Sequence, residues 1–239
     1  MVVPDTWTLA RIIDKVRDDL DLHAEDFVTF DDMRQFVNDA VDDCEEIVVD
    51  CFSDFLLTYR DLTVESGQTE IPLPEDLYES RIRGFYYSQT GFTDSNPVGD
   101  AYKIKKLSIE RLTDVSKGDD YLYRLINKNP FRQKLVVFPP IRENSTTQFR
   151  LWYIRQFNRL HETTDILEKG ARIQYILSHV KCAVLQKSGD AMLEVEMQKL
   201  MKQEDKLKNS LSRLTDDDED VYLEPDLHAL DEAYGQDYY

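Results

Sequence analysis

The stretch TFDDMRQFVNDAVDDCEEIVVDC (29–51) carries the clearest structural pattern in the chain. Its apolar residues recur every three or four positions over about five turns, the period of one face of an α-helix. Thr29 and Asp32 resemble a capping box, in which two side chains bond each other's backbone N–H groups at the helix entry. The stretch predicts a long amphipathic helix with this apolar stripe: Met33, Phe36, Val37, Ala40, Val41, Cys44, Ile47, Val48 and Cys51.

Three further helices are predicted at the two ends of the chain. Apolar residues spaced by three and four from Leu9 to Leu20 predict a helix that Thr6 or Thr8 caps. Residues 173–184 predict another, which the sequence KSGD (187–190) ends. A highly charged helix follows. Its methionines could form an adaptable binding surface, but we favour an interpretation as core residues: Met192, Met197 and Met201.

Between these helices the chain has the composition of β-strands. YLYRLINKN (121–129), KLVVFPP (134–140) and TTQFRLWYIRQFNRL (146–160) are rich in β-branched and aromatic residues, with turn residues between them. The connections are too short for parallel crossovers, so we expect an antiparallel meander. Alternate residues of 149–154 put apolar bulk on both faces of the last strand, which predicts a strand packed on one face and partly covered on the other. Prolines at 72 and 74 place 70–77 at a sheet edge or in an extended crossing.

The order of these elements predicts an α+β protein. It is a bundle of about four helices with an inserted antiparallel β-meander and a flexible acidic C-terminal tail. The expected parts are an N-terminal helical pair (1–52), an inserted β-rich region (53–165), a C-terminal helical pair that completes the bundle (166–214) and the tail (215–239). The outer helices come together because each must bury its apolar stripe.

Charge and composition exclude several classes of partner. The 239 residues carry a formal net charge of −18, which argues against a general nucleic-acid binder and leaves room only for a local basic face. No run of apolar residues approaches the ~18 of a membrane span, and the N-terminus lacks the pattern of a secretory signal. Three cysteines, Cys44, Cys51 and Cys182, indicate buried apolar side chains in a reducing cytoplasm.

Motifs for catalysis or cofactor binding do not stand out in the sequence. There is no glycine-rich phosphate loop and no G-x-S-x-G elbow, and the four histidines are scattered. The acidic pairs at 31–32, 42–43 and 119–120 lack the loop spacing of a calcium hand, so we interpret them as helix caps and solvated faces. We therefore expect no enzyme, no catalytic residues, no cofactor and no metal site.

The last 24 residues differ from the rest. They hold ten acidic residues and no Lys or Arg, a composition typical of a segment that is disordered alone. Apolar and aromatic residues punctuate the acids, so the segment is either a frayed terminus or, as we favour, one that folds onto a partner. The candidate anchors are Tyr222, Leu223, Leu227, Leu230, Tyr234, Tyr238 and Tyr239.

Four motifs together resemble a known family. They are FDD (30–32) at the helix entry, IPLPED (71–76), LVVFPP (135–140) and FRLWY (149–153). In this order they are similar to tailed-bacteriophage head–tail connectors, the adaptor or head-completion proteins. The resemblance covers most of 5–212 and leaves the acidic tail outside.

The resemblance implies a structural virion protein at the neck, made in the host cytoplasm. Copies form a ring, usually of twelve, beneath the portal protein ring, extend the DNA channel and give tail or nozzle proteins a docking platform. DNA is then only passing cargo, and no membrane is involved. Two alternatives remain. One is a non-viral protein–protein interaction module that binds a partner through its acidic C-terminal tail. The other is a metal-assisted nuclease, which would need clustered carboxylates and nearby Lys.

Overall fold

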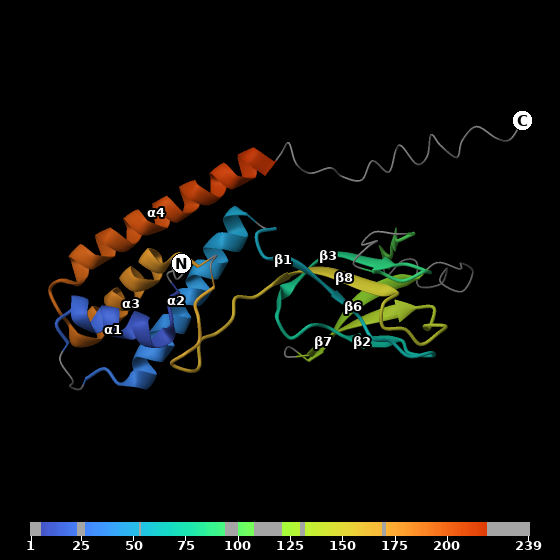
Figure 1. The fold of residues 1–239 in the computed structure, drawn as a ribbon, viewed down its shortest axis with the longest axis horizontal. Coiled ribbons are helices and arrows are strands. Elements are labelled where there is room, and N and C mark those ends of the chain that lie inside the picture. Colours follow the sequence, from blue (N-terminus) through green and yellow to red (C-terminus); the bar gives the residue numbers. More distant parts are fainter. Residues whose placement is uncertain are drawn as a thin grey trace, which may run out of the picture. The chain divides into compact units, whose positions relative to one another are not determined.

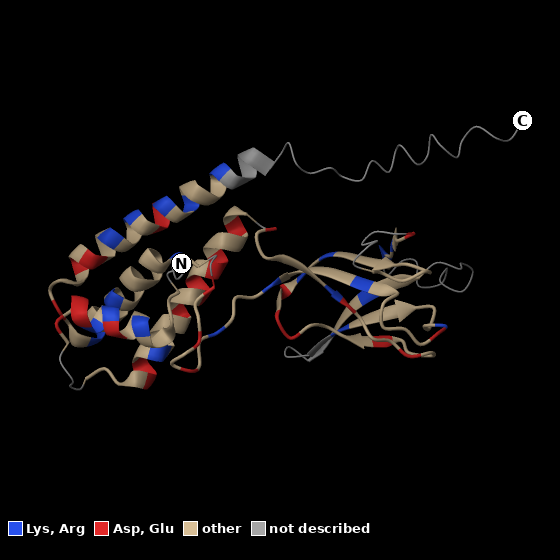
Figure 2. Cartoon of the chain, viewed as in Figure 1, with Lys and Arg blue, Asp and Glu red and all other residues tan. Residues whose placement is uncertain are grey.

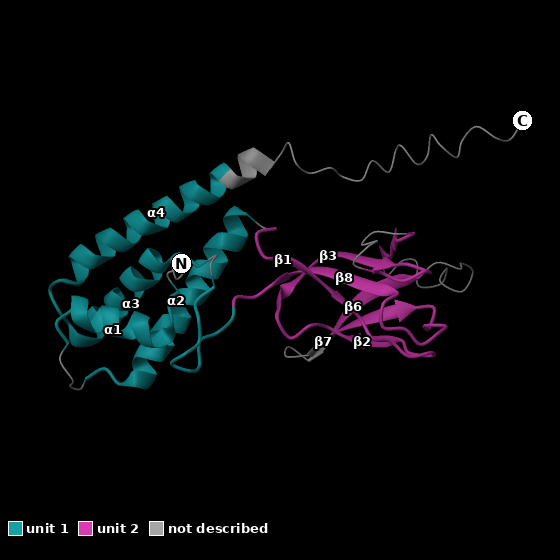
Figure 3. Ribbon diagram, viewed as in Figure 1, with its two compact units in different colours: residues 1–52, 158–239 teal, residues 53–157 magenta. Residues whose placement is uncertain are grey.

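The computed structural model confirms the α+β class and divides into two compact units. It describes residues 6–22, 27–52, 54–93, 100–107, 121–129, 132–168 and 171–218. A helical unit comprises Met1–Phe52 and Asn158–Tyr239, and a β unit comprises Ser53–Phe157 (Figure 3). The elements, labelled in Figure 1, are α1 Leu9–Asp19, α2 Phe30–Cys51, β1 Leu57–Asp61, β2 Glu70–Pro72, β3 Leu77–Tyr87, β4 Tyr102–Lys103, β5 Lys105–Lys106, β6 Leu122–Asn129, β7 Arg132–Phe138, β8 Phe149–Arg155, α3 Ile173–Ser188 and α4 Leu193–Asp218.

The ends of the helices follow the predicted capping chemistry. The Thr8 side chain accepts a hydrogen bond from the Arg11 N–H and caps α1. At α2 the capping box is complete, because the Thr29 hydroxyl accepts from the Asp32 N–H and the Asp32 carboxylate accepts from the Thr29 N–H. Gly189 ends α3 in the left-handed conformation (φ 68°), which glycine adopts without steric cost.

Helix α2 lies at the centre of the helical unit and contacts α1, α3 and α4. It therefore buries more of its surface than one stripe. Val49 and Glu45, which the predicted stripe leaves out, are 1% and 4% exposed. Each fully buried aliphatic side chain contributes about 1.5–3 kcal/mol to folding. The buried residues of this helix are Met33, Val37, Ala40, Val41, Cys44, Glu45, Val48 and Val49.

The segment 158–168 belongs to the helical unit although it contains no helix. The Asn38 amide of α2 bonds Leu160 twice, accepting from its N–H and donating to its carbonyl, each at 2.9 Å. The Leu9 N–H donates to the Asp165 carbonyl (3.0 Å), and the Leu167 N–H donates to the Trp7 carbonyl (2.8 Å). These bonds fix the returning chain against α2 and against the start of α1.

The β unit is a pair of four-stranded sheets, and this corrects the expected meander. The strand orders are β1-β8-β3-β4 and β2-β7-β6-β5. β6 and β7 form the predicted antiparallel hairpin, but β8 pairs with β1 and β3 in the other sheet. β5 and β6 are parallel. The 15 residues between them are long enough for the connection that parallel strands require.

The core of the β unit lies between the two sheets. Phe85 of β3 meets Tyr123 of β6 edge to face, with ring centroids 5.7 Å apart. Phe149, Leu151 and Tyr153 of β8 point into this core, as predicted. The residues that form it are Leu62, Val64, Ile71, Phe85, Ile104, Tyr121, Leu135, Val137, Ile141, Phe149, Leu151 and Tyr153.

Candidate interaction surfaces

The structure describes the chain only as far as residue 218, so the seven predicted tail anchors lie outside the described residues. They are Tyr222, Leu223, Leu227, Leu230, Tyr234, Tyr238 and Tyr239. The last described element, α4, ends at Asp218, and its side chains are described as far as Arg213. The tail therefore stays a sequence prediction, and the candidate surfaces below come from the two units.

The acidic pairs of α2 are engaged in caps and ion pairs. Asp32 accepts from Lys187 of α3 at 2.8 Å, and with Thr29 this bond lowers the pKa of Asp32 to about 2. Asp42 pairs with Arg159, and Asp43 contacts Nε2 of His179 at 2.8 Å. Across the described ranges no group of three or more His, Cys, Asp or Glu is placed to hold a metal ion. The pair at 119–120 lies outside those ranges.

The cysteines are placed as apolar residues rather than as reactive thiols. Cys44 and Cys182 are buried, Cys51 is half-buried, and all three are free thiols. Burial raises the pKa of Cys44 and of Cys182 to about 11 in each case. At neutral pH these two side chains are therefore protonated and weakly nucleophilic.

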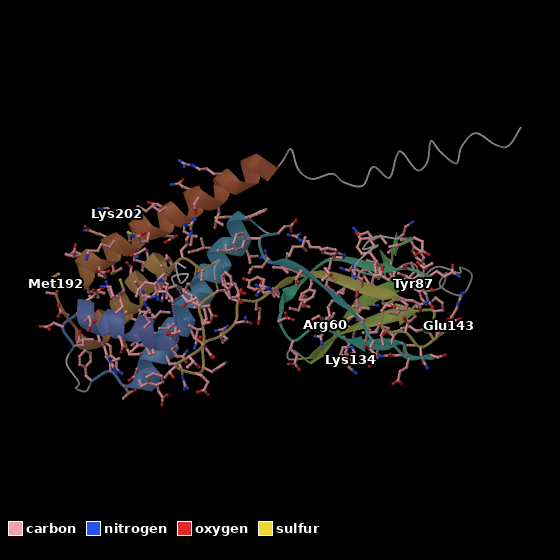
Figure 4. The ribbon with its side chains drawn as sticks, viewed as in Figure 1. Arg60, Tyr87, Lys134, Glu143, Met192 and Lys202 are labelled. Atoms are coloured by element: carbon pink, nitrogen blue, oxygen red, sulfur yellow. The ribbon has the colours of Figure 1, made fainter. Side chains whose placement is uncertain are left out.

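The methionines of α4 are exposed, which makes their interpretation as core residues wrong. Met197 and Met201 are 45% and 59% exposed, and Met192 just before the helix is 55% exposed (Figure 4). The helix faces α2 and α3 with a different stripe, in which Leu207 and Leu211 are 2% and 3% exposed. Apolar and charged residues alternate around several faces of α4. The sequence alone therefore does not show which face the other helices cover.

The outer face of the first sheet carries a buried arginine. Arg150 of β8 is 3% exposed and lies between the rings of Tyr59 and Phe92, 4.1 and 4.3 Å from their centroids. Asp61 of β1 binds it with two hydrogen bonds, at 2.7 and 3.0 Å. The prediction that both faces of β8 are covered is confirmed here, since Ile154 on the same face is fully buried. This cluster ties β1 to the sheet.

A groove of about 640 Å³ lies between the edge strands of the two sheets. Tyr153 lines it and donates a hydrogen bond to Asp76 at 3.0 Å. Burial, and after it this hydrogen bond, raises the pKa of the phenol to about 12. The wall opposite β1 is the IPLPED stretch of the sequence, 71–76. The lining residues are Arg60, Asp61, Leu62, Thr63, Ile71, Pro72, Leu73, Pro74, Glu75, Asp76 and Tyr153.

Charge is divided unequally between the units. Residues 53–157 contain fifteen Lys and Arg against fourteen Asp and Glu, for a net charge of +1. The rest of the chain contains fourteen against thirty-three, for −19, of which the ten acids of 216–239 supply more than half. Figure 2 shows acidic residues in red along helix α2, which holds eight Asp and Glu and one Arg. In the β unit, by contrast, Lys103, Lys105 and Lys106 are all exposed on the short strands β4 and β5.

A family model described as SU10 adaptor protein matches residues 7–227 of the chain. The chain belongs to this family. It is a family of phage head–tail adaptors, as the sequence motifs predict. No curated protein matches the chain.

The match to the SU10 adaptor family covers both units and extends further than the sequence resemblance. The expected limit was residue 212, with the acidic tail outside, whereas the family match continues to residue 227. It therefore includes the first three tail anchors, Tyr222, Leu223 and Leu227. The beginning of the tail therefore lies inside the matched region, and the rest of it lies outside.

Proposed function

We propose that this protein forms a ring beneath the portal, extends the DNA channel and gives the tail or nozzle proteins a platform to dock on. The observation that carries the proposal is the match to the SU10 adaptor family over residues 7–227. In this arrangement twelve copies sit at the neck of the virion, and the protein acts without catalysis. The division into helical pairs 1–52 and 166–214, an insertion 53–165 and a tail 215–239 stays a prediction, and the returning segment that starts at Asn158 groups with the helices.

The charge of the chain supports a role in which DNA is only passing cargo. Nucleic-acid binders gain affinity by neutralising phosphates with clustered Lys and Arg, whereas this chain carries −18. An acidic channel wall lets DNA move past without holding it. Within the described part of the chain, no helix is both long and apolar enough to cross a membrane.

The tail is proposed to join the ring to the portal. Its ten acids would meet a basic portal surface, while its tyrosines and leucines enter pockets there. A segment that orders only on docking makes stable attachment depend on the correct partner. Synthesis in the host cytoplasm follows from assembly on a portal that is itself in the host cell.

Deletion of residues 215–239 tests this role of the tail. We expect the truncated chain to lose capture by purified portal rings while keeping its far-ultraviolet circular dichroism and its unfolding midpoint. A matched variant keeps all ten acids and replaces the seven anchors by Ser, which separates anchoring from charge. Portal capture that is unchanged by the deletion would contradict this function of the tail.

A further inference from the structure

The β unit is closed along one side and open along the other. β4 is the edge of the first sheet and β5 is the edge of the second, and only Ile104 separates them in sequence. Ile104 is 1% exposed, and its N–H donates to the Phe85 carbonyl at 2.7 Å. The chain thus crosses from one sheet to the other at this side. The opposite edges are β1 and β2, and the groove lies between them.

The open side presents backbone groups that another chain can pair with. The Leu62 N–H donates to the Phe149 carbonyl, and the Arg155 N–H donates to the Leu56 carbonyl. In an antiparallel pair alternate residues bond the partner strand, so these two bonds direct Thr58 and Arg60 toward β8. The N–H and carbonyl groups of Tyr59 and Asp61 consequently face the free edge. Such an edge is a template for an added strand.

The two sides carry opposite charge. On the closed side Lys103, Lys105 and Lys106 are exposed, and none forms an ion pair with a carboxylate of the described residues. On the open side Glu75 and Asp76 are exposed carboxylates in the groove, while the charge of Asp61 is balanced by Arg150. Among the residues that line the groove Arg60 is the cation, so the lining as a whole carries a net negative charge.

We propose that the lysine edge β4–β5 of one copy docks against the β1–β2 groove of the next copy. The proposal rests on the ring of the proposed function and names the contact that joins its subunits. The order β1-β8-β3-β4 puts the two surfaces on opposite sides of one sheet, about 14 Å apart by three strand spacings of about 4.8 Å. A contact between two different surfaces is head-to-tail, and such contacts repeat around a closed ring.

Charge reversal on each surface, in the full-length chain, tests this contact. K103E/K105E reverses the lysine edge. T63K/E75K makes the groove positive and leaves the Tyr153–Asp76 hydrogen bond in place. K202E/K206E, at two exposed lysines of α4, changes the net charge as much as the edge variant does and serves as the control. Ring formation is measured by mass photometry and by electron-microscope class averages, with and without portal rings, and circular dichroism checks folding.

We expect each of the two surface variants to lower the fraction of chains in rings by about tenfold or more, because like charges that face each other across the contact repel. A factor of ten corresponds to about 1.4 kcal/mol. The control keeps its rings. The four-site variant K103E/K105E/T63K/E75K exchanges the signs of both surfaces and restores ring formation.

Two results would overturn the contact while the wild-type ring survives. One is a surface variant that assembles as the wild type does. The lysines would then serve only to prevent unwanted pairing of an exposed edge strand with other chains. The other is a four-site variant that does not regain rings. If K103E/K105E keeps its rings but loses DNA binding at low salt, the lysine edge binds phosphates instead of a second copy. Absence of rings from the wild-type chain under both conditions would overturn the proposed function itself, and the contact with it.

Discussion

Replacing Asp61 by Asn is expected to destabilise the β unit through the buried arginine it binds. The Arg150 side chain is 4% exposed and the Asp61 side chain 29%. Removal of one partner from a buried ion pair costs about 3–5 kcal/mol, because the other charge is left without compensation. Water reaches Asp61 in part, so we reduce the expected loss to about 2–3 kcal/mol. The aromatic rings on either side of Arg150 stay in place and hold the guanidinium.

The assay is urea unfolding followed by tryptophan fluorescence. The chain has two tryptophans, Trp7 in the helical unit and Trp152 in the β unit, so a Trp7→Phe background leaves a single reporter of the β unit. With a urea slope of about 1–3 kcal/mol/M, the midpoint should fall by about 1–2 M. Arg150→Met should cost less, about 1–2 kcal/mol, since a lone Asp61 is solvated at the surface.

The double variant completes the cycle. We expect D61N/R150M to be less destabilised than the sum of the single variants by about 1 kcal/mol or more, which is the signature of two groups that interact. A free energy of unfolding for D61N within about 0.5 kcal/mol of the wild-type value, or strictly additive losses, would refute the reasoning that Asp61 compensates the buried charge.

Three further changes test the fold. Thr29→Ala removes the capping box of α2 and should cost about 1 kcal/mol in thermal unfolding, whereas Thr29→Ser should not. The pKa of Asp32 is lowered to about 2 by Lys187 and Thr29, so its contribution to stability is present above pH 4 and is lost as the pH falls toward 2; Asp32→Asn should flatten that part of a pH series. A pH dependence unchanged in this variant would contradict the ion pair. Phe85→Ala, at a fully buried core position, should lower the stability of the β unit by about 3–5 kcal/mol in the fluorescence assay, and a loss below about 1 kcal/mol would show that Phe85 is not a core residue.

The helices could be predicted because their signals are local. Thr29 and Asp32 mark a helix entry within three residues, and Gly189 marks an exit by its own conformation. The spacing of apolar residues gives the helical period without knowledge of any partner. The fraction of the α2 surface that is buried could not be predicted from this spacing. Glu45 is buried because three other helices contact α2.

The partners of the strands could not be predicted in the same way. The sequence of β8 predicts a strand that is covered on both faces, but it does not identify the strands that pair with it. These are β1 and β3, and β7 lies in the other sheet. The expected meander assumed that strands adjacent in sequence pair, which long-range contacts overrode. The exposed methionines of α4 show the same limit, because a helix surface becomes core only where another element covers it.

The candidate surfaces were partly visible in the sequence. The composition left room for a local basic face, and the exposed lysines of YKIKK (102–106) form one. The groove was not predictable, since it requires two edge strands from different sheets and the register of each. Arg150 was predicted to lie on a partly covered face, but its ion pair depends on Asp61, 89 positions away in sequence.

Affinity isolation of the tagged full-length chain from infected cells, followed by electron-microscope class averages, tests the central claim most directly. The account predicts a ring of this chain stacked on the larger ring of the portal, with tail proteins on the opposite side. Separate globules without any ring, isolated from cells that contain complete particles, would contradict it. A protein–protein interaction module that binds through its acidic tail would then be the better description.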